Sequence, residues 1–292
     1  MKRTAVILAV LSAALCAAAQ NSGKPAQQTP PAAGQAGPAQ GAAPPAKHPP
    51  QAKTQPEFDA WKTASANTDP AAFEKAADDF ATKFPDSELR SLLYKNAMRL
   101  YQNANNGEKT EAMGRKVLGF DGDDPEALVI VAEVIAERTR ETDLDKDQRY
   151  DEATKMAEKA TTTVDTDVNV PAGTPQDKLD AYKSLLRSNA YSIVGTIAYK
   201  KDNFAVAQEN LQKSIDAYPA QLDPVVVLRL ALSLDKQQKY PEALKVANRA
   251  VEVAQAQNNA QVVTVAQRER DRLQQLTGGA PPAPPASQPP KN

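Results

Sequence analysis

The sequence predicts an all-α fold in which about five helical hairpins stack in a row and a last helix covers the end. Two segments, 190–219 and 225–255, share one pattern: small and apolar residues at helical spacing, a polar turn, and a second such run. They align with an offset of 36 residues. A repeat of this length indicates a unit that buries its apolar face by stacking on its neighbours. No stretch of the chain reads as a convincing strand.

The first 19 residues predict an export signal. Lys2 and Arg3 precede an apolar run of 15 residues, and three alanines at 17–19 form a small-residue cleavage site. The run is too short to span a bilayer comfortably. We therefore expect an exported protein, in the periplasm, with outer-membrane association or secretion as open alternatives. Cys16, the only cysteine, leaves a lipid anchor open as well, and its removal with the signal leaves no disulfide.

Composition sets the limits of the folded part. Residues 20–56 and 278–292 are rich in proline and predict disordered linkers, because they cannot bury enough apolar surface to fold. Residues 57–277 form the predicted domain and carry all 36 acidic residues against 29 Lys and Arg. This excess of negative charge disfavours nucleic acid as a partner, since phosphate binding needs a basic surface.

The earlier hairpins follow the same pattern more loosely. The first has Trp61 in a short helix and a second helix over 71–85, the second pairs 91–100 with 110–121, and the third pairs 125–138 with 149–160. After the fifth hairpin, 259–276 predicts the capping helix. Eight residues fall where paired helices approach closely and are predicted to be packed: Phe73, Ala97, Ala132, Ala153, Gly195, Ala207, Ala231 and Ala243.

The two clearest hairpins carry a recognisable signature. Their first helices place a small residue at Gly195 and Ala231 among larger ones, and their second helices place small residues at Ala207 and Ala243. This pattern resembles the tetratricopeptide repeat (TPR), as found in exported bacterial TPR proteins. The resemblance covers about three quarters of the chain. It implies a right-handed solenoid of about five TPR-like repeats with a C-terminal capping helix, flanked by disordered segments, and a scaffold that binds proteins or peptides in a concave groove.

The resemblance also implies which residues line that groove. Transferred onto this chain, they are Tyr94, Met98, Tyr101, Glu133, Asn189, Ser192, Thr196, Tyr199, Lys200, Leu228 and Lys236. Those between Asn189 and Tyr199 step by three or four, so one helix face can present them together. The alternative is that they are only the solvated side of the solenoid. The chain lacks the Lys, Asn and Arg cluster with which some TPR proteins hold a C-terminal carboxylate.

An acidic run within the third hairpin, "ETDLDKDQ" at 141–148, has two interpretations. Its alternating aspartates match the first ligands of a calcium loop of the EF-hand type, but Gln148 and Thr154 stand where that loop needs Gly and Glu. The other interpretation is a solvated loop whose negative charge lies near a helix N-terminus. A second run at 165–178 predicts an inserted loop between the third and fourth hairpins, and calcium binding there is equally open.

The sequence shows no catalytic constellation. His48 is the only histidine and lies in the proline-rich linker, and no glycine-rich phosphate loop follows a strand. We therefore expect no enzymatic activity, no cofactor and no metal ligand set. The predicted function is a protein-binding or peptide-binding scaffold of the cell envelope. A structural subunit of an outer-membrane or secretion assembly is one alternative, and a hydrolase that uses a carboxylate pair is another.

Overall fold

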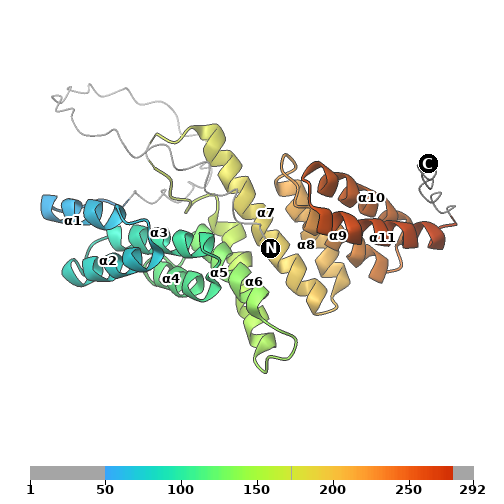
Figure 1. Ribbon diagram of the computed structural model, residues 1–292, viewed down its shortest axis with the longest axis horizontal. Helices are drawn as coiled ribbons and strands as arrows, with labels where there is room; N and C mark the ends of the chain where they lie inside the picture. Colours follow the sequence, from blue (N-terminus) through green and yellow to red (C-terminus); the bar gives the residue numbers. More distant parts are fainter. Residues whose placement is uncertain (1–49, 172, 279–292) are drawn as a thin grey trace, which may run out of the picture.

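The computed structural model describes residues 50–171 and 173–278, and every regular element in these ranges is a helix (Figure 1). The helices are α1 (Gln55–Ser65), α2 (Pro70–Lys83), α3 (Leu89–Asn103), α4 (Gly107–Phe120), α5 (Pro125–Arg138), α6 (Lys146–Thr163), α7 (Gln176–Lys200), α8 (Phe204–Ala217), α9 (Pro224–Lys236), α10 (Tyr240–Ala256) and α11 (Ala260–Leu276). The predicted signal at 1–19, Cys16, His48 and most of both proline-rich segments lie outside the described residues. Of the helices described, none combines the length and the apolar character that crossing a bilayer requires.

Consecutive helices pair into hairpins, and the hairpins follow one another in a row from α1 to α11 (Figure 1). The pairs are α1/α2, α3/α4, α5/α6, α7/α8 and α9/α10, and α11 packs on both α10 and α9. The predicted TPR-like arrangement of five hairpins and a capping helix is therefore confirmed. The predicted domain start at residue 57 lies within α1, which begins two residues earlier after the side-chain cap Thr54.

Three helices begin with the same dipeptide. Asp69, Asp124 and Asp223 each precede a proline, and each carboxylate accepts a hydrogen bond from a backbone N–H of the first turn. Proline at the first helical position costs no hydrogen bond, and the aspartate satisfies an orphan donor. The Asp-Pro pairs therefore set the start of α2, α5 and α9.

Four of the turns share one geometry. Asn105, Asp202, Gln238 and Asn258 have φ between 54° and 60°. In each turn the next residue donates its N–H to the carbonyl five positions back, as from Lys239 to Leu234 at 3.0 Å. This pattern closes the preceding helix and normally takes glycine at the left-handed position. At these four non-glycine residues the backbone is therefore strained, and glycine would relieve the strain.

Replacing Gln238 with glycine is expected to stabilise the chain by about 0.5–1 kcal/mol, because glycine adopts positive φ without the steric cost of a Cβ. Urea denaturation of the full chain measures the change. The control is Gln212→Gly in the middle of α8, where glycine is expected to cost about 1 kcal/mol. A loss of stability at both positions contradicts the strain assigned to the turn.

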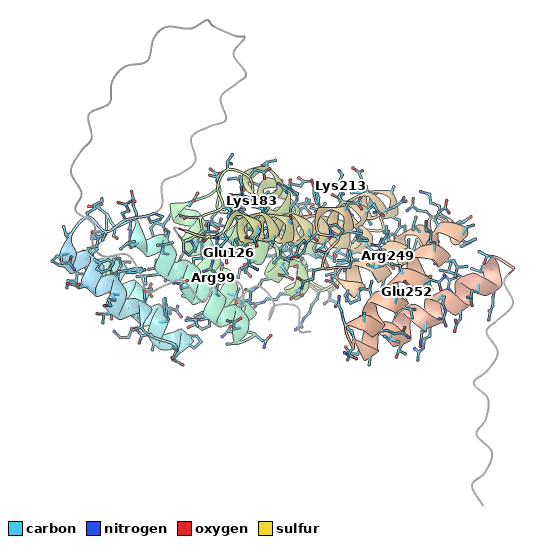
Figure 2. All side chains as sticks on the ribbon, turned by 90° about the horizontal axis from the view of Figure 1, so that it is seen from above. Arg99, Glu126, Lys183, Lys213, Arg249 and Glu252 are labelled. Atoms are coloured by element: carbon cyan, nitrogen blue, oxygen red, sulfur yellow. The ribbon has the colours of Figure 1, made fainter. Side chains whose placement is uncertain are left out.

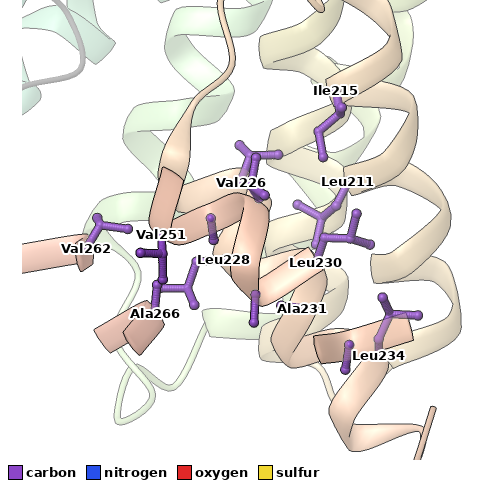
Figure 3. Close-up of a cluster of buried hydrophobic side chains, with 14 of the residues drawn as sticks. Leu211, Ile215, Val226, Leu228, Leu230, Ala231, Leu234, Val251, Val262 and Ala266 are labelled. Atoms are coloured by element: carbon purple, nitrogen blue, oxygen red, sulfur yellow. The ribbon is translucent and has the colours of Figure 1, made fainter. Parts of the chain in front are cut away.

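Within residues 50–171 and 173–278, the core consists of three apolar clusters that follow one another along the row. All eight residues predicted to pack are buried. Figure 3 shows the last cluster, in which Leu211 of α8, Leu230 of α9, Val251 of α10 and Ala266 of α11 are buried together. Most helices contribute one apolar stripe, whereas α5 is buried on nearly all sides. A hairpin therefore completes its core with its neighbours.

The structure departs from the expected elements at two places. The acidic connection between α5 and α6 covers only 139–145, so Asp147 and Gln148 are helical rather than part of a loop. The helix α7 begins at Gln176, well before the segment at 190 where the repeat signature starts, and has 25 residues. Its first half buries Tyr182 and Leu186 against the third hairpin, a contact that the repeat pattern does not contain.

Candidate functional site

The first helices of the hairpins form one side of the row. Arg99 of α3 pairs with Glu126 of α5, helix α5 contacts α7, and α7 contacts α9. We call the surface of these four helices the first-helix face. Figure 2 shows Arg99 of α3 and Glu126 of α5 next to each other. The residues predicted to bind a partner come from these four helices, and the structure places them in three different environments.

Four of the predicted groove residues lie in the core. Tyr94, Met98 and Tyr101 of α3 and Leu228 of α9 are buried, so none offers its side chain to a partner. The reason lies in the position of α3, which packs against both α2 and α4 and turns its 94/98/101 stripe toward them. The prediction of an open surface at these positions is corrected here to a packing role.

The two tyrosines of α3 join three helices through one repeated arrangement. The hydroxyl of Tyr94 donates to Asp78 of α2 at 2.7 Å, and Lys116 of α4 pairs with the same carboxylate at 2.6 Å. One turn away, Glu74 accepts hydrogen bonds from Tyr101 at 2.5 Å and from Lys109 at 2.9 Å. Burial, followed by the hydrogen bond to Glu74, raises the pKa of Tyr101 to about 12. These contacts hold α2, α3 and α4 together.

Lys200 also has a structural role. Its ammonium group donates to the carbonyl oxygen of Ala136 at 2.7 Å and lies over the ring of Tyr150 at 5.1 Å from the centroid. Ala136 is in the last turn of α5, where carbonyls lack intrahelical partners and a cation is favourable. Burial lowers the pKa of Lys200. The side chain therefore caps α5 across two hairpins.

The other predicted residues remain accessible. Asn189, Ser192, Thr196 and Tyr199 are half-buried on one side of α7, Glu133 is half-buried on α5, and Lys236 is exposed at the end of α9. The structure brings an additional residue to them: Nη1 of Arg229 donates to Oγ1 of Thr196 at 2.8 Å. The ring of Tyr199 meets Phe204 edge-on at 5.5 Å.

Arg229 was not among the predicted residues, although it lies one helical step after the predicted Leu228. Its guanidinium adds a donor and a positive charge to the surface between α7 and α9. Residues 173–278 hold 14 Lys and Arg against 11 Asp and Glu, whereas 50–171 hold 16 against 25. The accessible α7–α9 surface thus belongs to the more basic half of the chain.

A buried ionic cluster joins α3 to α5. Both guanidinium nitrogens Nε and Nη2 of Arg99 donate to Glu126 at 2.6 Å, and Lys95 pairs with Asp124. Glu126 is 3% exposed. Burial raises the pKa of Glu126, but the opposing charges of Arg99 and Lys95 outweigh it and lower the pKa to about 2. Lys95 and Arg99 are one turn apart, but their partners cannot be identified from the sequence.

A crevice with no room for a water molecule lies beside this cluster. It is lined by Lys95, Asp124, Pro125, Glu126, Val168, Asn169, Tyr182 and Leu186. The hydroxyl of Tyr182 is buried and makes no hydrogen bond. Burial raises the pKa of Tyr182, and the charge of the nearby Glu126 carboxylate raises it further. In the ranges 50–171 and 173–278 no three His, Cys, Asp or Glu side chains converge as a metal site.

Comparison with known proteins finds likeness in structure only. No protein-family model and no curated protein matches the chain. PilF of Pseudomonas aeruginosa is 16% identical, with a TM-score of 0.46 over 77% of this chain and 96% of that one. YrrB, described as a TPR protein with an unusual peptide-binding site, is 19% identical, with a TM-score of 0.42 over 69% and 90%. Yeast Tom70 is 16% identical, with a TM-score of 0.44 over 75% and 40%. At these values the likeness carries no information about partners.

Proposed function

We propose that the protein is a non-enzymatic scaffold that binds an acidic, extended segment of a partner protein on the α7–α9 part of the first-helix face. The observation that supports this proposal most directly is the cluster of Thr196, Tyr199 and Arg229. The exposed side chain of Lys236 adds a positive charge. An aromatic ring beside hydrogen-bond donors on a rigid surface suits recognition of a peptide, because little conformational entropy is lost on the scaffold's side.

Two features support an acidic partner. The C-terminal half of the chain has more basic than acidic residues, and complementary charge speeds association and selects between partners. Arg229 presents a planar group that suits carboxylates. The hydrogen bond from Arg229 to Thr196 also fixes the guanidinium in place before a partner arrives.

The test compares capture of partners by the full chain and by a double variant, Tyr199→Ala with Lys236→Glu. The matched control changes the same residue types away from this face, Tyr218→Ala with Lys245→Glu. We expect the double variant to bind a captured partner at least about tenfold more weakly, which corresponds to about 1.4 kcal/mol, and the control to retain it. Equal capture by both variants places binding elsewhere and contradicts the proposal.

Location forms a separate part of the proposal. The predicted signal at 1–19 supports action in the cell envelope, as a free periplasmic protein or one held by a lipid on Cys16. Cell fractionation with wild-type chain and Cys16→Ala tests this. Loss of membrane association in the variant supports the lipid. Recovery of the wild-type chain in the cytoplasm with residues 1–19 intact contradicts export.

A further inference from the structure

The segment at 165–171 differs from the other links between hairpins. The chain passes from α2 to α3, from α4 to α5 and from α8 to α9 through short connections, the longest of them 218–223. Between α6 and α7 it first runs through 165–171, which has no helix, and then enters the extended first half of α7 (Figure 1). We call residues 165–171 the cover segment.

The cover segment lies on the first-helix face. Val168 and Asn169 line the crevice together with Lys95 of α3, Glu126 of α5 and Tyr182 of α7. Val168 and Val170 are half-buried and pack against the core cluster of α5, α6 and α7. Three residues of the segment thus place two branched apolar side chains and one amide side chain over the central helices.

Weak contacts hold the cover segment in place. Lys183 donates to the carbonyl oxygen of Asp165 at 2.9 Å, and Arg187 pairs with the Asp165 carboxylate at 2.7 Å. The Asp165 side chain is 65% exposed, and ion pairs this accessible contribute little to stability. Within the described ranges, no backbone hydrogen bond joins 168–170 to a helix. Asp167 is tied to α6, because its backbone N–H donates to the carbonyl oxygen of Thr163 at 2.8 Å. The loosely held part is therefore 168–170, and such a part of a protein opens easily.

Beneath the cover segment, one buried polar group lacks a hydrogen-bond partner. Tyr182 is 7% exposed and its hydroxyl makes no hydrogen bond. A buried polar group without a partner is unfavourable and is rare in native structures. Neither the nearby Glu126 carboxylate nor the cover segment meets this hydroxyl in hydrogen-bonding geometry. An extended chain with a suitably placed carbonyl therefore gains a contact that the cover segment lacks.

We propose that the cover segment occupies, within the same molecule, a second peptide-binding site, and that a partner segment of similar chemistry displaces it. The partner is an extended peptide with two branched apolar side chains on either side of one polar residue, as in Val168-Asn169-Val170. This inference rests on the proposed function and adds a central site on α3, α5 and α7 to the α7–α9 surface. Because a tethered segment competes at an effective concentration in the millimolar range, the site is regulated by its own cover.

The test opens the site and adds the cover segment back as a separate peptide. The variant Val168→Asp with Val170→Asp, in the full chain, replaces both apolar contacts with charges. The probe is a fluorescently labelled synthetic peptide of residues 163–171, and its control carries the same two Val→Asp changes. Fluorescence anisotropy measures the binding. We expect the open variant to bind the probe at least about tenfold more tightly than the wild-type chain does, and not to bind the control peptide.

Two further variants keep the outcome decisive. Val168→Ser is a milder opening for use if the double variant loses helical circular dichroism, and we expect the same direction of change. Tyr182→Phe, combined with either opening, is expected to leave probe binding unchanged, because the cover segment makes no hydrogen bond to the Tyr182 hydroxyl. An open, folded variant that binds the probe no better than wild type overturns the inference, as does equal binding of the control peptide.

The two proposals fail separately. The open variants leave Tyr199, Arg229 and Lys236 unchanged, so a partner captured through the α7–α9 surface stays bound to them. Loss of probe binding with retained capture contradicts only the covered site. Probe binding without any effect of the Tyr199 and Lys236 changes on capture contradicts only the α7–α9 surface.

Discussion

Replacing Glu126 with alanine is expected to destabilise the protein by about 3–5 kcal/mol. The change leaves Arg99 without its bidentate partner inside the structure, and Lys95 loses a second carboxylate 3.8 Å away. Removing one side of a buried ion pair costs this much because the remaining charge stays out of water without compensation. Urea denaturation of the full chain at neutral pH, followed by circular dichroism, measures the loss.

The control removes both charges together. In the double variant Arg99→Met with Glu126→Met, no unpaired charge remains, and Lys95 keeps its ion pair with Asp124. Apolar replacements of a whole buried pair are often neutral or stabilising. We therefore expect the double variant to be at least about 2 kcal/mol more stable than Glu126→Ala. Equal losses in the two variants contradict the assignment of the cost to an unpaired charge.

The same ion pair gives the stability a pH dependence. The pKa of Glu126 is about 2 in the folded chain, below its ordinary value of 4.5. A lowered carboxyl pKa contributes stability that is fully present above about pH 4.5 and is lost as the pH falls toward 2. The shift corresponds to about 3 kcal/mol. In denaturation at pH 6 and pH 3 the wild-type chain is expected to lose more than half of this stability between the two, because pH 3 lies between the two pKa values. The Arg99→Met, Glu126→Met variant is expected to lose less.

Replacing Gly195 with leucine is expected to cost about 3 kcal/mol. A Cβ atom at this position of α7 meets Cγ of Leu211 at 2.7 Å and the backbone nitrogen of Leu211 at 3.0 Å. The clash includes backbone, so a change of side-chain rotamer in α8 does not relieve it. Overpacking of this kind typically costs about 1–3 kcal/mol, and a leucine adds three further carbons to the contact. Thermal unfolding of the full chain measures the effect.

Gly119 provides the matched control. It lies in the last turn of α4, and a Cβ built there meets no atom within 4 Å. Gly119→Leu is therefore expected to leave stability unchanged or to raise it by up to about 1 kcal/mol, because leucine favours helix more than glycine does. A melting temperature that falls equally in both variants contradicts the close α7–α8 contact.

The expected fold follows largely from local features of the sequence. Small residues such as Gly195 and Ala231, set among larger ones at helical spacing, indicate where helices approach each other, and the structure buries them. The Asp-Pro pairs at 69–70, 124–125 and 223–224 begin three helices through contacts with residues at most three positions away. Such features are visible in one dimension because all their partners are near in sequence.

The candidate site was only partly predictable. The resemblance to the TPR implies that Thr196 and Tyr199 lie on one side of α7, and the structure leaves them accessible. The same resemblance implies an open surface at Tyr94 and Tyr101, whereas α2 and α4 enclose them through Asp78 and Glu74. Spacing along one helix gives the direction of a side chain, but it does not show which neighbouring helix covers that direction.

The helical hairpins, their number, their order and their close-packed positions could be predicted from the sequence. Each of these features depends on residues within one repeat. The tertiary structure alone decided that Glu126 neutralises Arg99, 27 residues away, and that Lys200 caps α5, 64 residues away. It also decided that residues 165–171 lie on the first-helix face. The physical reason is the same in all three cases. Stacking of the hairpins brings together groups that are far apart in the sequence, and the local order of residues does not show which groups will meet.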